Sequence, residues 1–300
     1  MNPFNVLLLS FALASAAFAA DPIKVLYFTK SSGWEHSVVK WGPNGEPSYS
    51  EKVLTGLGEK EGFAFTYSKD GSLFSAEYLE SFDVVFFYTS GSLHKVGTDG
   101  QPAITAAGKQ ALLDWVERGG GFMAVHAASD SYHTYESFDG NTPKDKRGHR
   151  YEYHGEASDP YIKMLGGEFI NHGSQQEAAA TVVDPEFPGM EGLGAEIRVM
   201  EEWYSLKEYA SDNHVLMVMQ TEGMEETPYE RPDYPLSWAR PFGEGRVYYN
   251  AMGHREDVWD SAYFQAMLAG GIRWTAGELE ADVEPNLLEA APGAMALPPQ

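Results

Sequence analysis

Short apolar runs alternate with amphipathic segments through the first half of the chain. The apolar runs predict strands, and the recurrence of apolar residues every three or four positions in 50–61 and 105–118 predicts helices between them. Further strands and an apolar closing helix are expected later in the chain. The predicted strands span residues 23–29, 63–67, 82–88, 121–125, 178–183, 197–200, 215–220 and 245–250, and the closing helix spans 262–276. Alternation of this kind is typical of an α/β domain with right-handed crossovers and a parallel sheet.

Two of these strands lead to a histidine. His126 follows the unbroken apolar run 122–125, and His254 follows the strand at 245–250 after Gly253. Ligands of covered parallel sheets bind outside the carboxyl ends of the strands, so the two histidines predict a polar site there. His126 either caps its strand as a structural residue or faces the crevice as base, acid or ligand. Asp130 could orient the His126 ring or cap a following helix.

Acidic and aromatic residues supply the rest of the candidate site. Glu201, Glu202, Trp203 and Tyr204 are consecutive, a combination that resembles the lining of a sugar site. Strand alternation would turn one of the two acids inward and the other outward. Other candidates for contact with a substrate are Trp34, His36, Trp238 and Arg240. Arg240 would bind a carboxylate or phosphate, or tie its segment to an internal acid.

His126, Glu202 and His254 could together hold a divalent metal such as zinc. No pair of histidines has the helical His-x-x-x-His spacing of a zinc site, but the neighbouring segments offer further candidate ligands: His133, His149, His154 and His172. Residues 29–33 lack the glycine spacing of a dinucleotide loop, so no nucleotide cofactor is expected. The chain has no cysteine, which excludes disulfides, thiolate nucleophiles and cysteine metal sites.

The net charge of −23 argues against nucleic acid or an anionic membrane as partner. Residues 1–19 have the apolar core and small-residue cleavage pattern of a signal peptide, and the run is too short to favour a membrane span. We therefore expect a periplasmic or secreted protein. The expected organisation is one α/β domain over 20–277, containing a long polar loop at 131–159, and a flexible acidic and Pro/Ala-rich tail over 278–300.

Several segments together resemble the ThuA-like (trehalose utilisation) family. They are residues 125–130, 165–173, 201–204, 235–240, 243–249 and 253–257, and the similarity runs from about residue 24 to 277. The resemblance implies a flavodoxin-like, class I glutamine amidotransferase-like three-layer sandwich with a mostly parallel central sheet. In those amidotransferases a cysteine occupies the sharp turn where His126 stands here, so amidotransferase chemistry is not expected.

The family resemblance implies disaccharide catabolism through 3-keto-sugar intermediates. The leading hypothesis is an exported enzyme acting on a disaccharide or keto-glycoside, of isomerase, lyase or hydrolase type. His126 and His254 would transfer protons or hold a metal, Glu202 would be acid, base or ligand, and Asp130 would orient His126. The alternatives are a noncatalytic carbohydrate-binding protein and a subunit of a sugar-processing complex. Either way, the expected partner is a small carbohydrate, and assembly into a homo-oligomer is compatible with the sequence.

Overall fold

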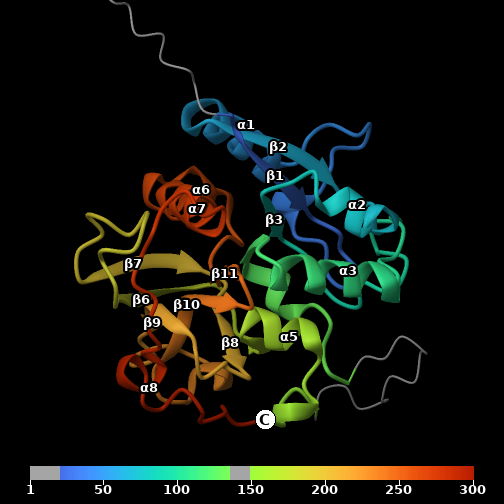
Figure 1. Cartoon of the computed structure of the whole chain (residues 1–300). Coiled ribbons are helices and arrows are strands. Elements are labelled where there is room, and N and C mark those ends of the chain that lie inside the picture. Colours follow the sequence, from blue (N-terminus) through green and yellow to red (C-terminus); the bar gives the residue numbers. More distant parts are fainter. Residues whose placement is uncertain (1–20, 136–148) are drawn as a thin grey trace, which may run out of the picture.

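A nine-stranded sheet runs through the part of the chain that this computed structural model describes, residues 21–135 and 149–300 (Figure 1). The predicted signal peptide lies outside the described residues. In spatial order the strands are β2 (Phe63–Ser68), β1 (Ile23–Phe28), β3 (Val84–Phe87), β4 (Gly121–Val125), β11 (Gly245–Asn250), β10 (Tyr234–Phe242), β9 (His214–Met219), β6 (Gln176–Val182) and β7 (Glu196–Glu201). A separate two-stranded sheet pairs β5 (Glu168–His172) with β8 (Tyr204–Lys207).

The large sheet is half parallel and half antiparallel. From β2 to β11 all neighbours are parallel, in the order 2-1-3-4-5 of doubly wound flavodoxin-like sheets if β11 is taken as the fifth strand. From β11 to β7 all neighbours are antiparallel. The expected mixed α/β class is therefore confirmed, but the prediction of a mostly parallel sheet is wrong. The cause is the β10–β11 hairpin, whose turn at Gly243 reverses the strand direction.

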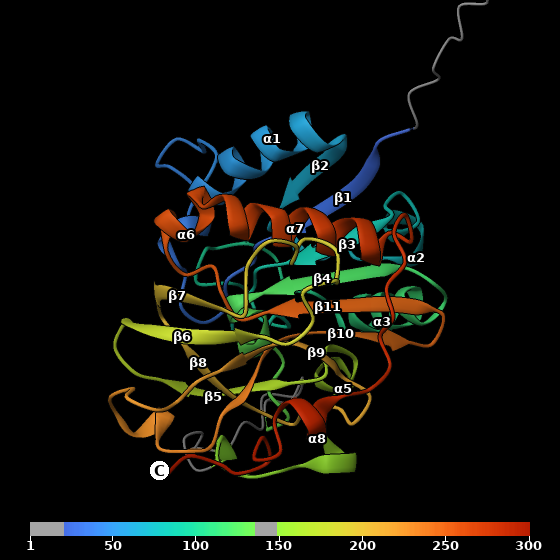
Figure 2. The same cartoon turned by 90° about the vertical axis from the view of Figure 1, so that its left-hand side faces the viewer.

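Helices cover both faces of the parallel half (Figures 1 and 2). One side carries α1 (Tyr49–Glu61), α6 (Glu256–Asp260) and α7 (Ala262–Thr275), and the other carries α2 (Ala76–Leu79), α3 (Ala106–Glu117) and α5 (Pro160–Leu165). Local sequence sets their ends. Ser48 and Glu51 form a reciprocal capping box at the start of α1, and Gly62 ends that helix in the left-handed conformation. Within the described residues, no helix combines the length and apolar character needed to cross a bilayer.

Strands β4 and β11 end side by side. They are parallel neighbours, with Val125 opposite Asn250, and both are buried along almost their whole length. The chain leaves β4 through the 3₁₀ turn His126–Asp130, against which β5 packs. The register of this pair therefore brings the segments that carry His126 and His254 to the same edge of the sheet.

The C-terminal segment, which the sequence predicted to be flexible, packs against the sheet. It contains α8 (Leu287–Ala290) and buries Leu287, Ala291 and Ala294. Arg231 donates to the Ala294 carbonyl at 2.7 Å, and the Asn286 side chain bonds to both backbone groups of Val215. Buried apolar side chains of the tail hold it against the start of β9, a contact that composition alone did not reveal.

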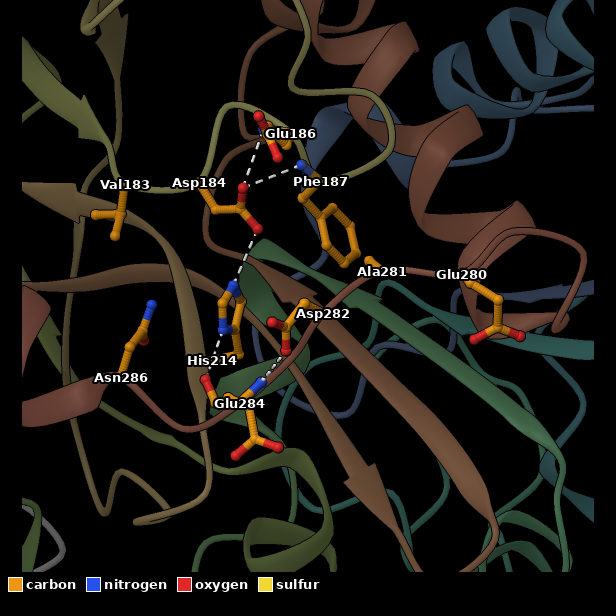
Figure 3. A pocket seen from close by; sticks show the side chains of 10 residues that line it. All are labelled: Val183, Asp184, Glu186, Phe187, His214, Glu280, Ala281, Asp282, Glu284 and Asn286. Atoms are coloured by element: carbon orange, nitrogen blue, oxygen red, sulfur yellow. Dashed lines mark hydrogen bonds and ion pairs between the residues drawn. The ribbon is translucent and has the colours of Figure 1, made fainter.

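A cavity of about 480 Å³ lies between this segment and the sheet (Figure 3). Five acidic residues line it, and His214 bridges its walls by bonding to Asp184 Oδ2 at 3.0 Å and to the Glu284 carbonyl at 2.7 Å. None of its lining residues is one of the predicted site residues. The cavity therefore belongs to the attachment of the tail, not to the candidate site.

We expect Leu287→Ala to lower the free energy of unfolding by about 2 kcal/mol, because it removes a buried side chain from the tail contact. Leu288→Ala is the matched control, since Leu288 is 68% exposed and its loss should change stability by less than about 0.5 kcal/mol. Chemical denaturation followed by circular dichroism measures both. Equal stability of the two variants would show that the tail does not contribute to folding.

Candidate functional site

Four side chains from distant parts of the sequence converge at the carboxyl edge of the sheet: His36, His126, Glu202 and His254. One donor atom from each lies within 4.8 Å of the others. The atoms nearest Glu202 Oε2 are His254 Nδ1 at 3.1 Å, His126 Nε2 at 3.4 Å and His36 Nε2 at 3.8 Å. We call these four residues the histidine cluster. The structure thus brings together the three predicted metal ligands and adds a fourth, His36, which the sequence had suggested only as a substrate contact.

His126 is held in an unusual backbone conformation. Its φ of 44° is in the left-handed region, which costs a residue with a side chain about 1–3 kcal/mol. Its carbonyl accepts hydrogen bonds from the Tyr249 hydroxyl at 2.9 Å and the Ser129 hydroxyl at 3.2 Å. Ring atom Nδ1 bonds to the Ala251 carbonyl at 3.0 Å, which fixes the ring and turns Nε2 toward Glu202. The strain therefore serves to aim one imidazole nitrogen into the cluster.

Glu201 holds the turn that carries His254. Its carboxylate is buried and accepts from the backbone N–H groups of Gly253 at 2.9 Å and His254 at 3.1 Å. Burial raises the pKa of Glu201 to about 7. Gly253 has a φ of 119°, a conformation that side chains disfavour. The expected division of the two acids into one inward and one outward is wrong, because β7 ends at Glu201 and both carboxylates serve the same edge.

Charge in the cluster is concentrated on Glu202. Burial lowers the pKa of His126 to about 4 and also lowers the pKa of His36, which keeps both rings neutral. Desolvation would raise the pKa of Glu202, but the three imidazoles beside its carboxylate outweigh that effect and hold the pKa far below its usual range. Contact with Glu202 raises the pKa of His254 against the effect of burial. The cluster is thus a carboxylate surrounded by imidazoles, two of which present bare nitrogens.

The donor set suits a divalent metal. Neutral imidazole nitrogens with one carboxylate oxygen are typical of zinc and of other first-row divalent ions. His126 Nε2 and His254 Nδ1 are buried and have no hydrogen-bond partner among the described residues. Buried polar atoms are normally satisfied, so two such nitrogens facing one point fit a shared divalent cation. The Ala251 carbonyl on His126 is the kind of second contact that orients a metal-bound histidine.

A cavity of about 830 Å³ opens beside the cluster. It is lined by His36, Glu202, Tyr204 and His254, together with the predicted contact Trp34, which is 74% exposed. The sequence had named His172 only as a further metal candidate. It assigned no role at the site to the other polar residues on the wall, which are Glu35, Ser37, Lys40, Arg150 and Asn171. His172 Nδ1 lies 3.4 Å from Glu202 Oε1, so this histidine borders the cluster from the cavity side.

Asp130 lines the same cavity but does not orient His126. Its Oδ1 accepts from His133 Nε2 at 2.8 Å and from Arg150 Nη2 at 3.1 Å, whereas the His126 ring is fixed by Ala251. The 3₁₀ turn that follows His126 carries Asp130 away from the ring, toward β5. His133 and His149 have acidic partners outside the cluster, and His154 is not one of its members.

Three predicted substrate contacts lie outside the cavity. Trp203 and Trp238 are fully buried, and their indole N–H groups donate to the carbonyls of Gln176 and Leu165. Arg240 forms a bidentate pair with Asp212 at 2.8–2.9 Å, the structural alternative that the sequence had left open. Because strand alternation and packing turn these side chains into the core, the sequence motif alone misplaced them.

The comparisons with known proteins agree with this architecture. A ThuA-like protein from Bacteroides uniformis matches with a TM-score of 0.60 at 20% identity, covering 87% of this chain and 94% of that chain. A ThuA-like protein from Parabacteroides merdae matches with a TM-score of 0.55 at 17% identity, covering 92% and 96%. A protein of Salmonella typhimurium LT2, described as cytoplasmic, matches with a TM-score of 0.54 at 13% identity, covering 84% and 99%.

At these identities the solved structures show a shared fold alone. Among curated proteins, no sequence matches the chain significantly. The model of the family described as trehalose utilisation matches residues 24–275, a span that contains all four residues of the histidine cluster. Over most of its length, therefore, this chain is a member of the ThuA family.

Proposed function

We propose that this protein is a metal-dependent enzyme of carbohydrate metabolism that acts on a keto derivative of a disaccharide. The observation that carries the proposal is the histidine cluster, in which two buried imidazole nitrogens face Glu202 without a hydrogen bond at the edge of an 830 Å³ cavity. The family description, trehalose utilisation, supports a sugar as the substrate class. The predicted signal sequence adds export to the proposal.

The metal would be held by His36 Nε2, His126 Nε2, His254 Nδ1 and a Glu202 oxygen. When bound, it would polarise a carbonyl or hydroxyl oxygen of the substrate. The neutral imidazoles and the single carboxylate leave a divalent ion with a net positive charge of about one, which keeps it electrophilic. Ala251 and Glu201 would keep His126 and His254 in place during turnover.

A keto-sugar suits this arrangement because its carbonyl acidifies the adjacent C–H bonds, so that a positioned base can start an isomerisation or an elimination. Trp34 offers an exposed indole beside the cavity, on which a pyranose ring can stack through its apolar face. The buried Tyr204 ring packs against His126 at 4.2 Å and closes the floor of the site.

Elemental analysis joined to an activity assay tests the proposal. We expect the purified chain to contain about one divalent ion per molecule, to convert 3-keto-trehalose, and to lose both ion and turnover after dialysis against dipicolinate. Zinc or another divalent ion should restore turnover. A metal-replete preparation that holds far less than one ion per chain would rule out the metal centre.

A noncatalytic carbohydrate-binding protein is the second candidate, favoured by the exposure of Trp34 at the cavity. The same preparations distinguish the two. A binder would retain its affinity for trehalose after chelation and would leave 3-keto-trehalose unchanged, whereas the enzyme would convert it only with the metal present.

A further inference from the structure

A buried chain of charges ends at the wall of the cavity. It begins with Lys207, whose ammonium lies 3.2 Å from Glu168 Oε2, and both side chains are fully buried. Glu168 Oε1 bonds to His133 Nδ1 at 2.7 Å, and His133 Nε2 bonds to Asp130 Oδ1 at 2.8 Å. The signs alternate along this path: ammonium, carboxylate, imidazolium, carboxylate. Asp130 is the member that reaches the cavity, with a side-chain exposure of 17%.

Such an arrangement is costly to bury. Removing several charges from water carries a desolvation cost that their mutual attraction offsets only in part. Its mechanical effect is clear, however: His133 and Arg150 both bind Oδ1 of Asp130 and so fix the orientation of the carboxylate. Among the described residues no hydrogen bond reaches Asp130 Oδ2. Oδ1 is therefore fixed by His133 and Arg150, and Oδ2 remains as a hydrogen-bond acceptor at the cavity wall.

The surroundings of Asp130 suit a hydrogen-bond acceptor better than a proton acceptor. Hydrogen bonds from its ring to the two carboxylates raise the pKa of His133 to about 9 despite its burial. His133 and Arg150 in turn lower the pKa of Asp130, although burial opposes them. An efficient general base has a pKa near the working pH. A carboxylate that stays ionised can instead accept hydrogen bonds from substrate hydroxyls without taking their protons.

We propose that Asp130 is a specificity residue that recognises a hydroxyl group of a sugar ring through its free Oδ2, and that His133 is the residue that positions it. The substrate class this selects is a sugar ring with an unmodified hydroxyl at the recognised position, as found in an unsubstituted pyranose of a glycoside. The inference rests on the proposed carbohydrate function and replaces the catalytic role that the sequence suggested for Asp130.

Calorimetric titration of the full chain with trehalose and with its monodeoxy analogues tests this assignment. Charge-assisted hydrogen bonds are among the stronger ones, so Asp130→Asn should weaken trehalose binding by about 10- to 100-fold. The wild type should disfavour the analogue that lacks the recognised hydroxyl by a similar factor, and Asp130→Asn should bind it as well as it binds trehalose. Asp212→Asn is the matched control, because Asp212 also pairs with an arginine but lies outside the cavity.

His133→Gln adds a readout of positioning. Alone it should weaken trehalose binding, and combined with Asp130→Asn it should weaken binding no further, because both changes act on one carboxylate. Additive losses would show that His133 acts elsewhere. Circular dichroism verifies that each variant is folded, and if Asp130→Asn is not, Asp130→Ser takes its place.

Three outcomes would overturn the assignment: no binding of trehalose or of any analogue by the wild type, equal binding of all analogues, or wild-type affinity in Asp130→Asn. Metal content is measured on the same preparations, and the titrations are repeated after chelation. A missing metal counts against the proposed enzyme, whereas hydroxyl discrimination that does not depend on Asp130 counts against this inference.

Discussion

The variant His126→Asn is expected to bind metal at least about 100-fold more weakly than the wild type, because it removes a ligand whose nitrogen is already aimed at the other three. Turnover of 3-keto-trehalose should fall with metal occupancy. Asparagine is chosen because it tolerates the left-handed backbone better than most side chains, so that the φ of 44° adds little new strain. Competition with a chromophoric chelator measures the affinity.

His214→Asn makes the same chemical change outside the histidine cluster. His214 bonds to Asp184 and to the Glu284 backbone in the other cavity, so its loss should leave metal affinity unchanged. Full metal binding by His126→Asn, with the melting temperature of the wild type, would show that His126 is a structural residue. Equal loss in both variants would point to a general effect on folding.

A second large effect is expected in the pH dependence of stability, and its origin is His133. Its pKa in the folded state is about 9, above the ordinary value of 6.5, so the native state holds this proton more tightly than the unfolded chain does. The resulting stabilisation is complete below pH 6.5 and is lost as the pH rises through about 9. One pKa unit corresponds to about 1.4 kcal/mol, so the loss amounts to about 3 kcal/mol.

Denaturant unfolding at pH 6 and pH 10 measures this effect, and His133→Gln isolates it. The variant cannot gain the proton, so the difference in stability between wild type and variant should shrink across this interval. The charged groups around His133 are Asp130 and Glu168, with Lys207 and Arg150 beyond them, and His149 lies past the stacked Tyr135 ring. A constant difference at all pH values would show that His133 is not charged in the folded protein.

The parallel half of the fold could be predicted because its strands are apolar runs separated by amphipathic helices, and β1, β3 and β4 are buried accordingly. The antiparallel half of the sheet was harder to predict from the sequence. The segment that forms β10 was not among the predicted strands, yet it pairs on both sides, with an irregular register to β9. The direction of β10 depends on its hairpin with β11, which the hydrophobic pattern does not specify.

The candidate site also contains residues that the sequence could predict and residues that it could not. His126 and His254 could be found because each follows a strand, and the parallel register of β4 and β11 places the ends of these strands together. The membership of His36 depends on how the loop after β1 folds back, and the bond between His133 and Glu168 depends on the contact between β5 and the turn after β4. Both are products of tertiary packing that no local spacing encodes.

Glu201 and Glu202 are adjacent in the chain. Glu201 accepts a hydrogen bond from the backbone N–H of His254, and Glu202 contacts the His254 ring. The histidine cluster therefore joins segments that follow β1, β4, β7 and β11, and β7 is the strand at the far margin of the sheet. Such a centre can assemble only in a fully folded molecule. An ion bound there would connect the two halves of the sheet and would stabilise the folded state relative to the unfolded chain.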